Sequence, residues 1–223
     1  MRRTRSYGGS GPLNADFIDA VYGSFPLMIA LISIATFVLL ARAFRSLLLP
    51  LKAVVLNVLG GRGVGVMTLV WQSGHGSDEL WGIAATGSIA SWIPLMVFAF
   101  VHGLSMDYEV FILARMREEY DQTRDTDEAV VFGLARTGRL VTSAALILFL
   151  AFASMASGPE TDVKILATGL VAGILIDATV IRALLVPAVV SLFGRWAWWL
   201  PPGAARLLRV PPSAEPLAQT GGP

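Results

Sequence analysis

Acidic side chains lie within apolar stretches of this sequence, where an ionised group in a membrane span costs about 2.5–3.5 kcal/mol. Asp107 is the strongest candidate for chemistry. Removal from water favours the neutral form of a carboxyl group, so we expect Asp107 to bind and release a proton near neutral pH. Tyr108 adds a hydroxyl that can donate to a carboxylate or pass a proton on. Because neighbours on a helix point about 100° apart, this pair predicts a proton relay that reaches across to another helix.

A second interpretation leaves Asp107 near the cytoplasmic end of its helix, hydrated or paired with Arg115 or Arg117. We favour the relay, because ionisable groups inside a span are functional by default. Glu109 is a candidate supporting acid, but it lies closer to Arg115 and is also consistent with an interfacial position. His102 lies about one turn deeper than Asp107 and fits either a relay member or a packing histidine.

Two more charges lie inside apolar stretches. Asp177 is either a second buried carboxylate or a packing residue, and its spacing of five from Arg182 suits a pair on one helix poorly. Arg62 lies in the glycine-rich run GGRGVG, residues 60–65. From mid-span its side chain reaches water with difficulty, so it requires an acid such as Asp107 or Asp177, or a water-filled groove. We assign Arg62 no function.

Composition places these charges in a membrane protein. Of the 223 residues, 55% are hydrophobic and only 15% charged, with a mean hydropathy of +0.66, whereas soluble domains are roughly a quarter charged. The absence of cysteine excludes a disulfide scaffold, a thiolate metal site and a cysteine nucleophile. Two histidines argue against a zinc enzyme, and a net charge of +1 provides no basic field for nucleic acid. We expect no metal and no cofactor.

Five stretches are long and apolar enough to cross a bilayer, which takes about 20 residues. They cover residues 20–41, 53–72, 83–114, 140–157 and 163–194. The sequence therefore predicts an all-α, polytopic membrane bundle of five transmembrane helices over residues 20–200. We expect residues 1–19 to be an extracytoplasmic remnant or disordered. Residues 201–223, rich in proline, glycine and alanine, are expected to form a disordered cytoplasmic tail.

Basic residues gather in alternate connections and after the last span. They are Arg42, Arg45 and Lys52; Arg115, Arg117, Arg124, Arg136 and Arg139; and Arg195, Arg206 and Arg209. Since such loops stay inside the cell, we predict a multi-pass protein of the plasma membrane with a cytoplasmic C-terminus. In the largest basic loop, Asp125 with Glu128 three residues on predicts the start of a short amphipathic connector helix.

Small residues predict close helix packing. Gly61 and Gly65 have the GxxxG spacing that lets two helices approach, and so do Gly169 and Gly173. This spacing is common in membrane helices and by itself indicates no function.

The acidic motif also resembles a known family. Residues 103–120 (GLSMDYEVFILARMREEY) are similar to the central membrane signature of the MMPL transporters, in the resistance-nodulation-division superfamily. Shorter similar stretches cover residues 49–53, 127–130, 135–145, 173–182, 184–187 and 194–201. The resemblance extends over about residues 10–201.

The resemblance implies two repeated halves, each with one span, a large extracytoplasmic domain and five further spans. This chain resembles the last five spans of the second half. In the family, the pair matching Asp107 and Tyr108 faces an Asp-Tyr pair of the first half, and the two relay protons that drive export of lipids or other hydrophobic compounds. The implied energy source is the proton gradient. The implied partners are membrane lipids and the N-terminal half or a partner chain, and a homo-oligomer is a further expectation.

Two alternatives remain open. One is a truncated or split membrane module without independent transport. The other is an intramembrane aspartyl protease using Asp107 and Asp177, but such enzymes need Tyr-Asp and Gly-x-Gly-Asp, whereas here the order is Asp-Tyr and Asp177 follows Gly-Ile-Leu-Ile. We therefore expect a transporter rather than an enzyme.

Overall fold

The computed structural model describes residues 10–58, 62–74 and 76–210, and every regular element in these ranges is helical. In order they are α1 (Ser10–Phe44), α2 (Leu48–Val58), α3 (Arg62–Met67), η2 (Thr68–Gln72), α4 (Ser77–Trp81), α5 (Trp92–Thr123), α6 (Thr126–Met155), α7 (Thr161–Ile176), η3 (Asp177–Leu185), α8 (Val186–Phe193), η4 (Gly194–Trp198) and α9 (Pro202–Leu208). Of these, η2 and η3 are π-helices and η4 is a 3₁₀-helix.

Four helical segments of the described chain are long and apolar enough to cross a membrane: Ile18–Phe44, Trp92–Thr123, Thr126–Met155 and Thr161–Trp198. The polytopic helical bundle is thus confirmed. The count of five is not, because the predicted span 53–72 consists of two shorter pieces, α2 and α3 with η2. Residues 59–61 lie outside the described part of the chain.

The chain divides into two compact units, residues 1–36 and 37–223. In the first, residues 10–36 form most of α1, so the helix starts ten residues before the predicted span. Residues 10–19, predicted to be an extracytoplasmic remnant or disordered, belong to this helix. Pro12 is compatible with this, since the first turn of a helix needs no bonded N–H there. Residues 1–9 lie outside the described part.

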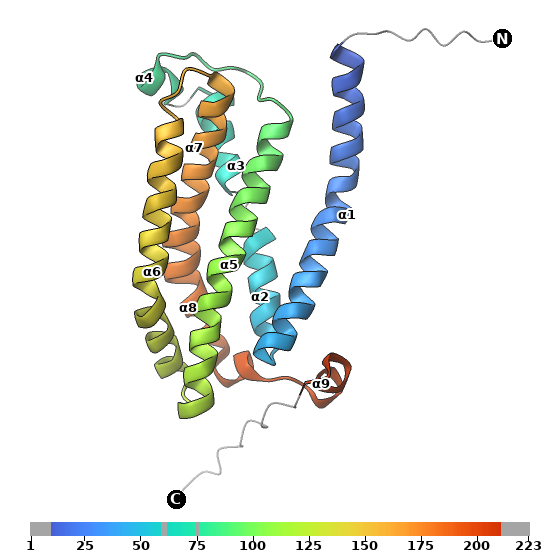
Figure 1. Ribbon diagram of the computed structural model, residues 1–223, viewed down its shortest axis with the longest axis vertical. Helices are drawn as coiled ribbons and strands as arrows, with labels where there is room; N and C mark the ends of the chain where they lie inside the picture. The colour runs from blue at the N-terminus through green and yellow to red at the C-terminus, as the bar shows by residue number, and fades with distance from the viewer. Residues whose placement is uncertain (1–9, 59–61, 75, 211–223) are drawn as a thin grey trace, which may run out of the picture. The chain divides into compact units, whose positions relative to one another are not determined.

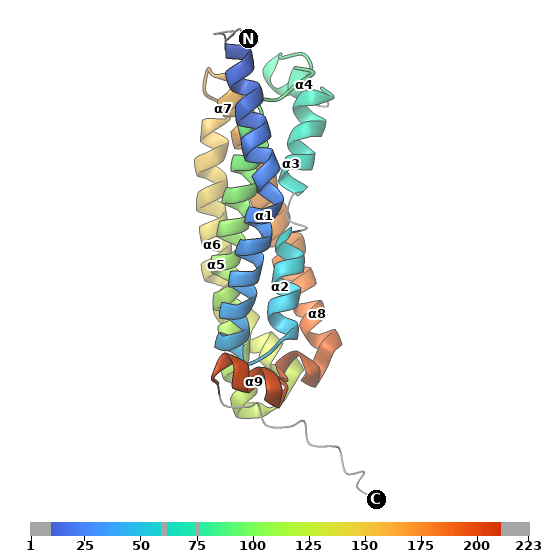
Figure 2. The ribbon, with the colours of Figure 1, turned by 90° about the vertical axis from the view of Figure 1, so that its right-hand side faces the viewer.

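In the second unit, α5, α6 and the continuous α7–η3–α8 segment run side by side (Figure 1). Helix α3 packs on α7 and α5, and α2 packs on α5 and η4. In Figure 2, α3 lies above α2. Asp125 caps α6 by accepting hydrogen bonds from the amides of Asp127 and Glu128, at 2.8 and 3.0 Å, which confirms the predicted cap. The predicted connector and the fourth predicted span form one helix, α6.

The tail contains a short helix where disorder was predicted from residue 201. Pro202 begins α9 in the position where proline suits a helix, and Arg42 donates a hydrogen bond to the carbonyl of Leu208 at 2.8 Å. Residues 211–223 lie outside the described part of the chain.

Two apolar clusters fill the second unit. One is built mainly from α2, the end of α5, the start of α6, α8 and η4, and includes Leu49, Ile112, Met116, Val186 and Trp198. The other is built from α3, η2, the start of α5 and α7, and includes Met67, Trp71, Ile93, Val97 and Ile165. On α5 and on the α7–η3–α8 segment, buried polar residues lie in sequence between the residues of the two clusters, and Asn57 ends the α2 contribution. We call these residues, together with the partly buried Asp177, the polar layer: Lys52, Asn57, Ser105, Glu109, Asp177 and Arg182.

Candidate functional site

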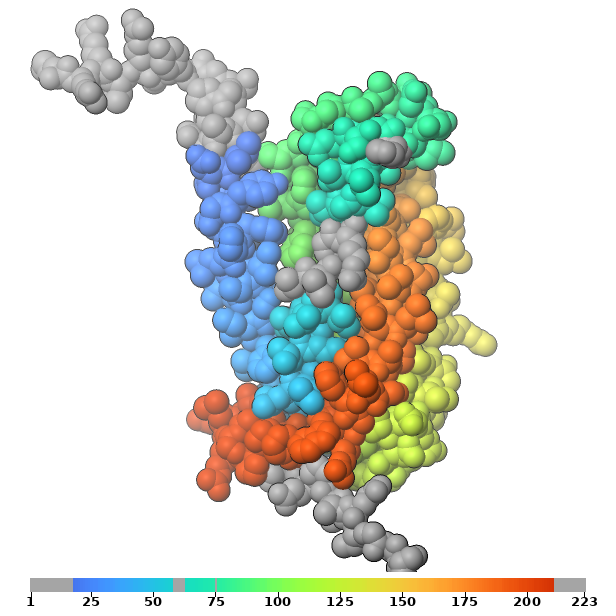
Figure 3. All heavy atoms as spheres, turned by 180° about the vertical axis from the view of Figure 1, so that it is seen from behind, coloured from blue at the N-terminus to red at the C-terminus, as the bar shows by residue number. Residues whose placement is uncertain are grey.

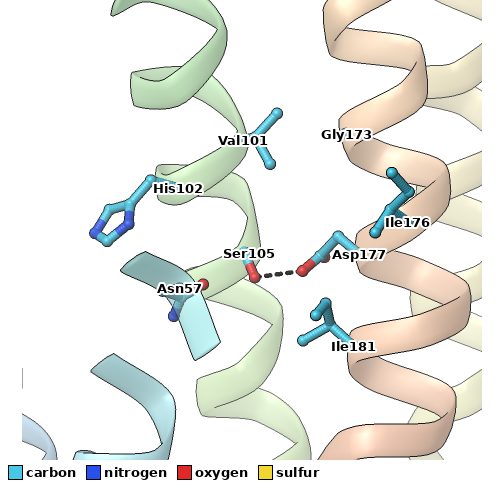
Figure 4. Close-up of a pocket in the computed structure, with 8 residues that line it drawn as sticks. All are labelled: Asn57, Val101, His102, Ser105, Gly173, Ile176, Asp177 and Ile181. Carbon is cyan, nitrogen blue, oxygen red and sulfur yellow. Dashed lines mark hydrogen bonds between the residues drawn. The ribbon is translucent and has the colours of Figure 1, made fainter. Parts of the chain in front are cut away.

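The polar layer contains an ion pair between Asp177 and Arg182, both on η3. Ser105 of α5 donates from Oγ to Oδ1 of Asp177 at 2.5 Å (Figure 4). Arg182 also donates to the backbone carbonyl of Ser105 at 3.3 Å. Because an unpaired buried charge is costly, these bonds are what permit a carboxylate and a guanidinium at this depth. They also tie η3 to α5.

The π-helical form of η3 explains a pair that the sequence argument considered poor. Five residues along an α-helix turn the chain by about 500°, which leaves the two side chains on different faces. A π-helix closes its hydrogen bonds from residue i to i+5, so residues five apart return to nearly the same face. Asp177 is the first residue of this π-helix and Arg182 the sixth of nine. The π-helical spacing therefore allows the observed pair, whereas the sequence left Asp177 as either a buried carboxylate or a packing residue.

A second ion pair joins α2 to α5. Nζ of Lys52 lies 2.9 Å from Oε1 of Glu109, and the two side chains are 3% and 4% exposed. Asn57 donates from Nδ2 to the other carboxylate oxygen of Glu109 at 3.2 Å. The sequence left Glu109 as a supporting or an interfacial acid, and the structure shows that its carboxylate is buried between helices and paired. Sequence reasoning assigned no site role to Lys52 or Asn57. The sequence did offer a signal for this pair: one basic residue, Lys52, lies in the apolar stretch 47–58, and Glu109 had no assigned partner.

Asp107 lies on a different face of α5 from this layer and is exposed. Its neighbours on that face are the exposed apolar residues Phe100, Val110 and Phe111. Within the described residues Asp107 makes no hydrogen bond and no ion pair. Ionisable residues of membrane spans usually face the interior of the bundle or a water-filled cavity, so an exposed acid among apolar residues is an unusual arrangement for a membrane helix.

The alternative partners of Asp107 are engaged elsewhere. Arg115 pairs with Glu118 at 2.5 Å on the surface of α5. Arg117 pairs with Asp121 at 3.1 Å and donates to the carbonyl of Trp198 at 3.1 Å. The arginines proposed in the second interpretation therefore serve local structure at the end of α5.

Tyr108 connects the exposed acid to the buried pair. It is half-buried, and the guanidinium carbon of Arg182 lies 4.9 Å from the centre of its ring. A cation over the face of a tyrosine ring is attracted by the ring quadrupole. Asp107, on the exposed face, is thus directly followed in the chain by a residue whose ring contacts Arg182 of the Asp177–Arg182 pair.

A profile of the MMPL family matches residues 6–212 of this chain. The chain belongs to the MMPL family. It is 41% identical to a putative membrane protein of Streptomyces coelicolor over 90% of this chain and 30% of that protein. It is 37% identical to the mycolic acid-containing lipids exporter MmpL11 of Mycolicibacterium smegmatis, over 96% of this chain and 22% of that protein. It is 40% identical to the trehalose monomycolate exporter MmpL3 of Mycobacterium tuberculosis, over 90% of this chain and 21% of that protein.

The chain matches only part of the length of each of these relatives. It spans between 21% and 30% of the length of these three relatives. The family membership and the four long apolar helices together make it a multi-pass membrane protein of a transporter family rather than an enzyme.

Two small cavities flank Asp177 in this MMPL bundle. One is lined by Asn57, His102, Ser105 and Asp177 (Figure 4), the other by Tyr108, Asp177 and Arg182 among others. Each has a volume of about 10 Å³ for the centre of a water-sized sphere, which is close to the room that one water needs. The layer therefore has space for water on both sides of the buried carboxylate.

His102 lies at the edge of this layer. Its ring is half-buried, stacks on Phe98 with centroids 5.4 Å apart, and points away from Asp177 in Figure 4. The structure thus places His102 beside the cavity but not in the Asp177–Arg182 pair.

The glycines of the MMPL bundle pack three helices closely. A Cβ on Gly63 would lie 2.7 Å from the carbonyl oxygen of Gly169 and 3.0 Å from Cα of Gly173. A Cβ on Gly169 would lie 2.8 Å from Val97, and one on Gly173 2.6 Å from Val101. The α3 contact is thus made by Gly63. Gly65 has no atom within 4 Å of the Cβ position, while Gly61 and the side chain of Arg62 lie outside the described part.

Proposed function

We propose that this chain forms a proton-coupled membrane bundle of an MMPL exporter for lipids or other hydrophobic compounds. The observation that carries the proposal is the position of Asp107. It is an exposed acid among apolar residues, without an ion pair in the described part of the chain, and next to a tyrosine whose ring contacts Arg182 of the Asp177–Arg182 pair. Such a face fits a second bundle that supplies the complementary polar groups, as the family resemblance implies.

In this mechanism, the charge on Asp107 changes when the residue gains or loses a proton. When Asp107 takes up a proton, α5 loses one negative charge and its attraction to polar groups of the facing bundle. One charge that crosses 100 mV supplies about 2.3 kcal/mol, which is enough to change the balance between two arrangements of packed helices. Asp107 and Tyr108 carry the proton, and α5 is the moving part.

The polar layer transmits the movement of α5. Glu109 links α5 to α2 through Lys52, and Ser105 links it to η3 through Asp177. Because both links are buried and charged, α5 cannot slide past α2 or η3 without breaking costly bonds. A shift of α5 therefore moves α2 and η3 with it, and Asp177 and Glu109 act as supporting residues of the relay.

The cargo and orientation follow from the relatives and from charge. Two of the three relatives described are exporters of mycolic acid-containing lipids and of trehalose monomycolate, so we propose a large amphipathic lipid as the cargo. The basic ends of α5 and η4 lie on the cytoplasmic side under the positive-inside rule, which places the C-terminus in the cytoplasm of a cell with this chain in its plasma membrane. The proposed partner is a first-half bundle on the same polypeptide or on another chain.

The test is export under a controlled gradient. Proteoliposomes contain this bundle together with a first-half bundle, and a mycolic acid-containing lipid is followed across the membrane. We expect transport when the proton gradient is imposed and a loss of at least tenfold when a protonophore removes it. Equal transport in the two conditions would contradict proton coupling. Absence of lipid movement in both would contradict the cargo.

A further inference from the structure

An apolar groove runs between α2 and α8, away from the polar layer. It consists of two adjoining hollows of about 260 and 380 Å³ that share Leu48 and Phe193. The smaller hollow extends along Val55 toward Lys52, and the larger ends at Trp196 and Trp199. Helices α2 and α8 lie next to each other on the face seen in Figure 3.

The groove is held open by fixed elements. At the end of α8, Gly194 adopts a φ of +52°, which glycine tolerates, and the chain turns into η4. Ser46 donates to the carbonyl of Ala197 at 2.5 Å, and Arg117 donates to that of Trp198 at 3.1 Å. These two bonds fix η4 against the turn before α2 and against α5. The tryptophans beside them are therefore held at the end of the groove.

The mouth of the groove lies where a membrane span ends. The apolar segment Thr161–Trp198 finishes in η4, so Trp196 and Trp199 occupy the level at which tryptophan is enriched in membrane proteins. Their rings meet edge to face, with centroids 5.5 Å apart. Arg195 is exposed, lies over the ring of Trp196, and makes no ion pair within the described residues. A free cation at this level faces the phosphate groups of the bilayer.

We propose that this groove is a binding site for an anionic phospholipid. One acyl chain lies along α2 and α8, and the phosphate lies at Arg195. Charge complementarity favours an anionic lipid over an uncharged apolar occupant, because Arg195 beside the mouth is exposed and makes no ion pair within the described residues, whereas Lys52 in the wall is already paired with Glu109. The proposal is independent of the proton relay.

The test compares two lipids that differ only in the headgroup. The purified chain, in a neutral detergent, is titrated with dioleoyl phosphatidylglycerol or dioleoyl phosphatidylcholine, and bound lipid is counted by native mass spectrometry. We expect one retained phosphatidylglycerol and a preference of about fivefold over phosphatidylcholine, the value for one arginine near a charged surface. Arg195→Gln should reduce the preference to about one. An unchanged preference would overturn the proposal.

A second pair of variants tests the groove itself. Val55→Trp fills the hollow and should weaken both lipids at least fivefold, whereas Leu146→Trp, on an exposed face of α6 outside the groove, should bind as the parent does. Helicity and elution volume show whether both variants fold. If Val55→Trp does not fold, the result for Arg195→Gln alone decides the test. Equal binding by the two tryptophan variants would overturn the proposal. So would binding of inorganic phosphate alone with the same Arg195 dependence, or a concentration-dependent dimer that Val55→Trp abolishes, which would assign the groove to a second copy.

Discussion

Lys52 and Glu109 form a buried ion pair that joins α2 to α5, with 2.9 Å between Nζ and Oε1. Glu109 of this pair lies two residues after Asp107 on α5, but it is buried in the bundle, whereas Asp107 is exposed. Helix α5 therefore carries one exposed acid, Asp107, and one buried acid, Glu109. In the proposed mechanism, the exposed acid changes its charge while the buried acid keeps α5 attached to α2.

Removal of one partner of this pair should be strongly destabilising. In Glu109→Gln the Lys52 ammonium remains buried without its counter-charge, which costs about 3–5 kcal/mol. Chemical denaturation in detergent measures the loss of unfolding free energy. The control is Glu118→Gln, which breaks the exposed pair with Arg115 and should cost at most about 1 kcal/mol. The double variant Lys52→Met with Glu109→Leu should recover most of the stability. Equal costs for Glu109→Gln and Glu118→Gln would show that the buried pair does not hold α2.

Ser105→Ala should loosen the contact between α5 and η3. The hydroxyl donates to a buried carboxylate, and a hydrogen bond to a charged group contributes about 1.5–3 kcal/mol. We expect a stability loss of this size together with slower transport, since the movement of α5 reaches η3 through this bond. Thr179→Ala is the matched control, because its hydroxyl bonds only to its own helix, at the carbonyl of Leu175. A Ser105→Ala variant as stable as Thr179→Ala would remove this link from the mechanism.

Gly63→Ala should separate α3 from α7. A methyl group there would lie 2.7 Å from a backbone oxygen, so the helices must move apart, at a cost of about 1–3 kcal/mol. Gly65→Ala lies two residues away, faces open space, and should be neutral or stabilising by up to about 1 kcal/mol. Thermal unfolding of the two variants side by side provides the comparison. The reverse order of stability would place the close contact elsewhere.

The proposed orientation predicts opposite labelling of the two ends of α5. The chain has no cysteine, so Asp78→Cys and Asp127→Cys each introduce one exposed thiol. The 32-residue helix α5, about 48 Å long, separates α4 from the start of α6. In intact cells a membrane-impermeant maleimide should label position 78 and spare position 127. Labelling of position 127 alone would invert the topology.

The sequence predicted most of the bundle because membrane spans depend on composition and length, which a single chain records. It also predicted the Asp125 cap, a local signal, and it selected Asp107 and Tyr108 by residue type. It did not predict the roles of Lys52 and Asn57, because the side of a helix that is buried depends on its neighbours. The Asp177–Arg182 pair was underrated since the spacing was judged for an α-helix, and a π-helix has no clear sequence signature. Apolar content predicted one span over residues 53–72, whose described residues form the shorter helices α2 and α3 with η2.

The most direct test of the account is the effect of Asp107→Asn on proton movement. Asparagine keeps the size and polarity of the side chain but cannot take up a proton in this range. Proteoliposomes with a pH-sensitive dye inside, this bundle and a first-half bundle report proton flux during lipid export, with Asp78→Asn as a control for the loss of an exposed acid. The account predicts that Asp107→Asn reduces flux and export by at least a hundredfold, while Asp78→Asn leaves both unchanged. Flux in Asp107→Asn at the rate of the unmodified chain would contradict it.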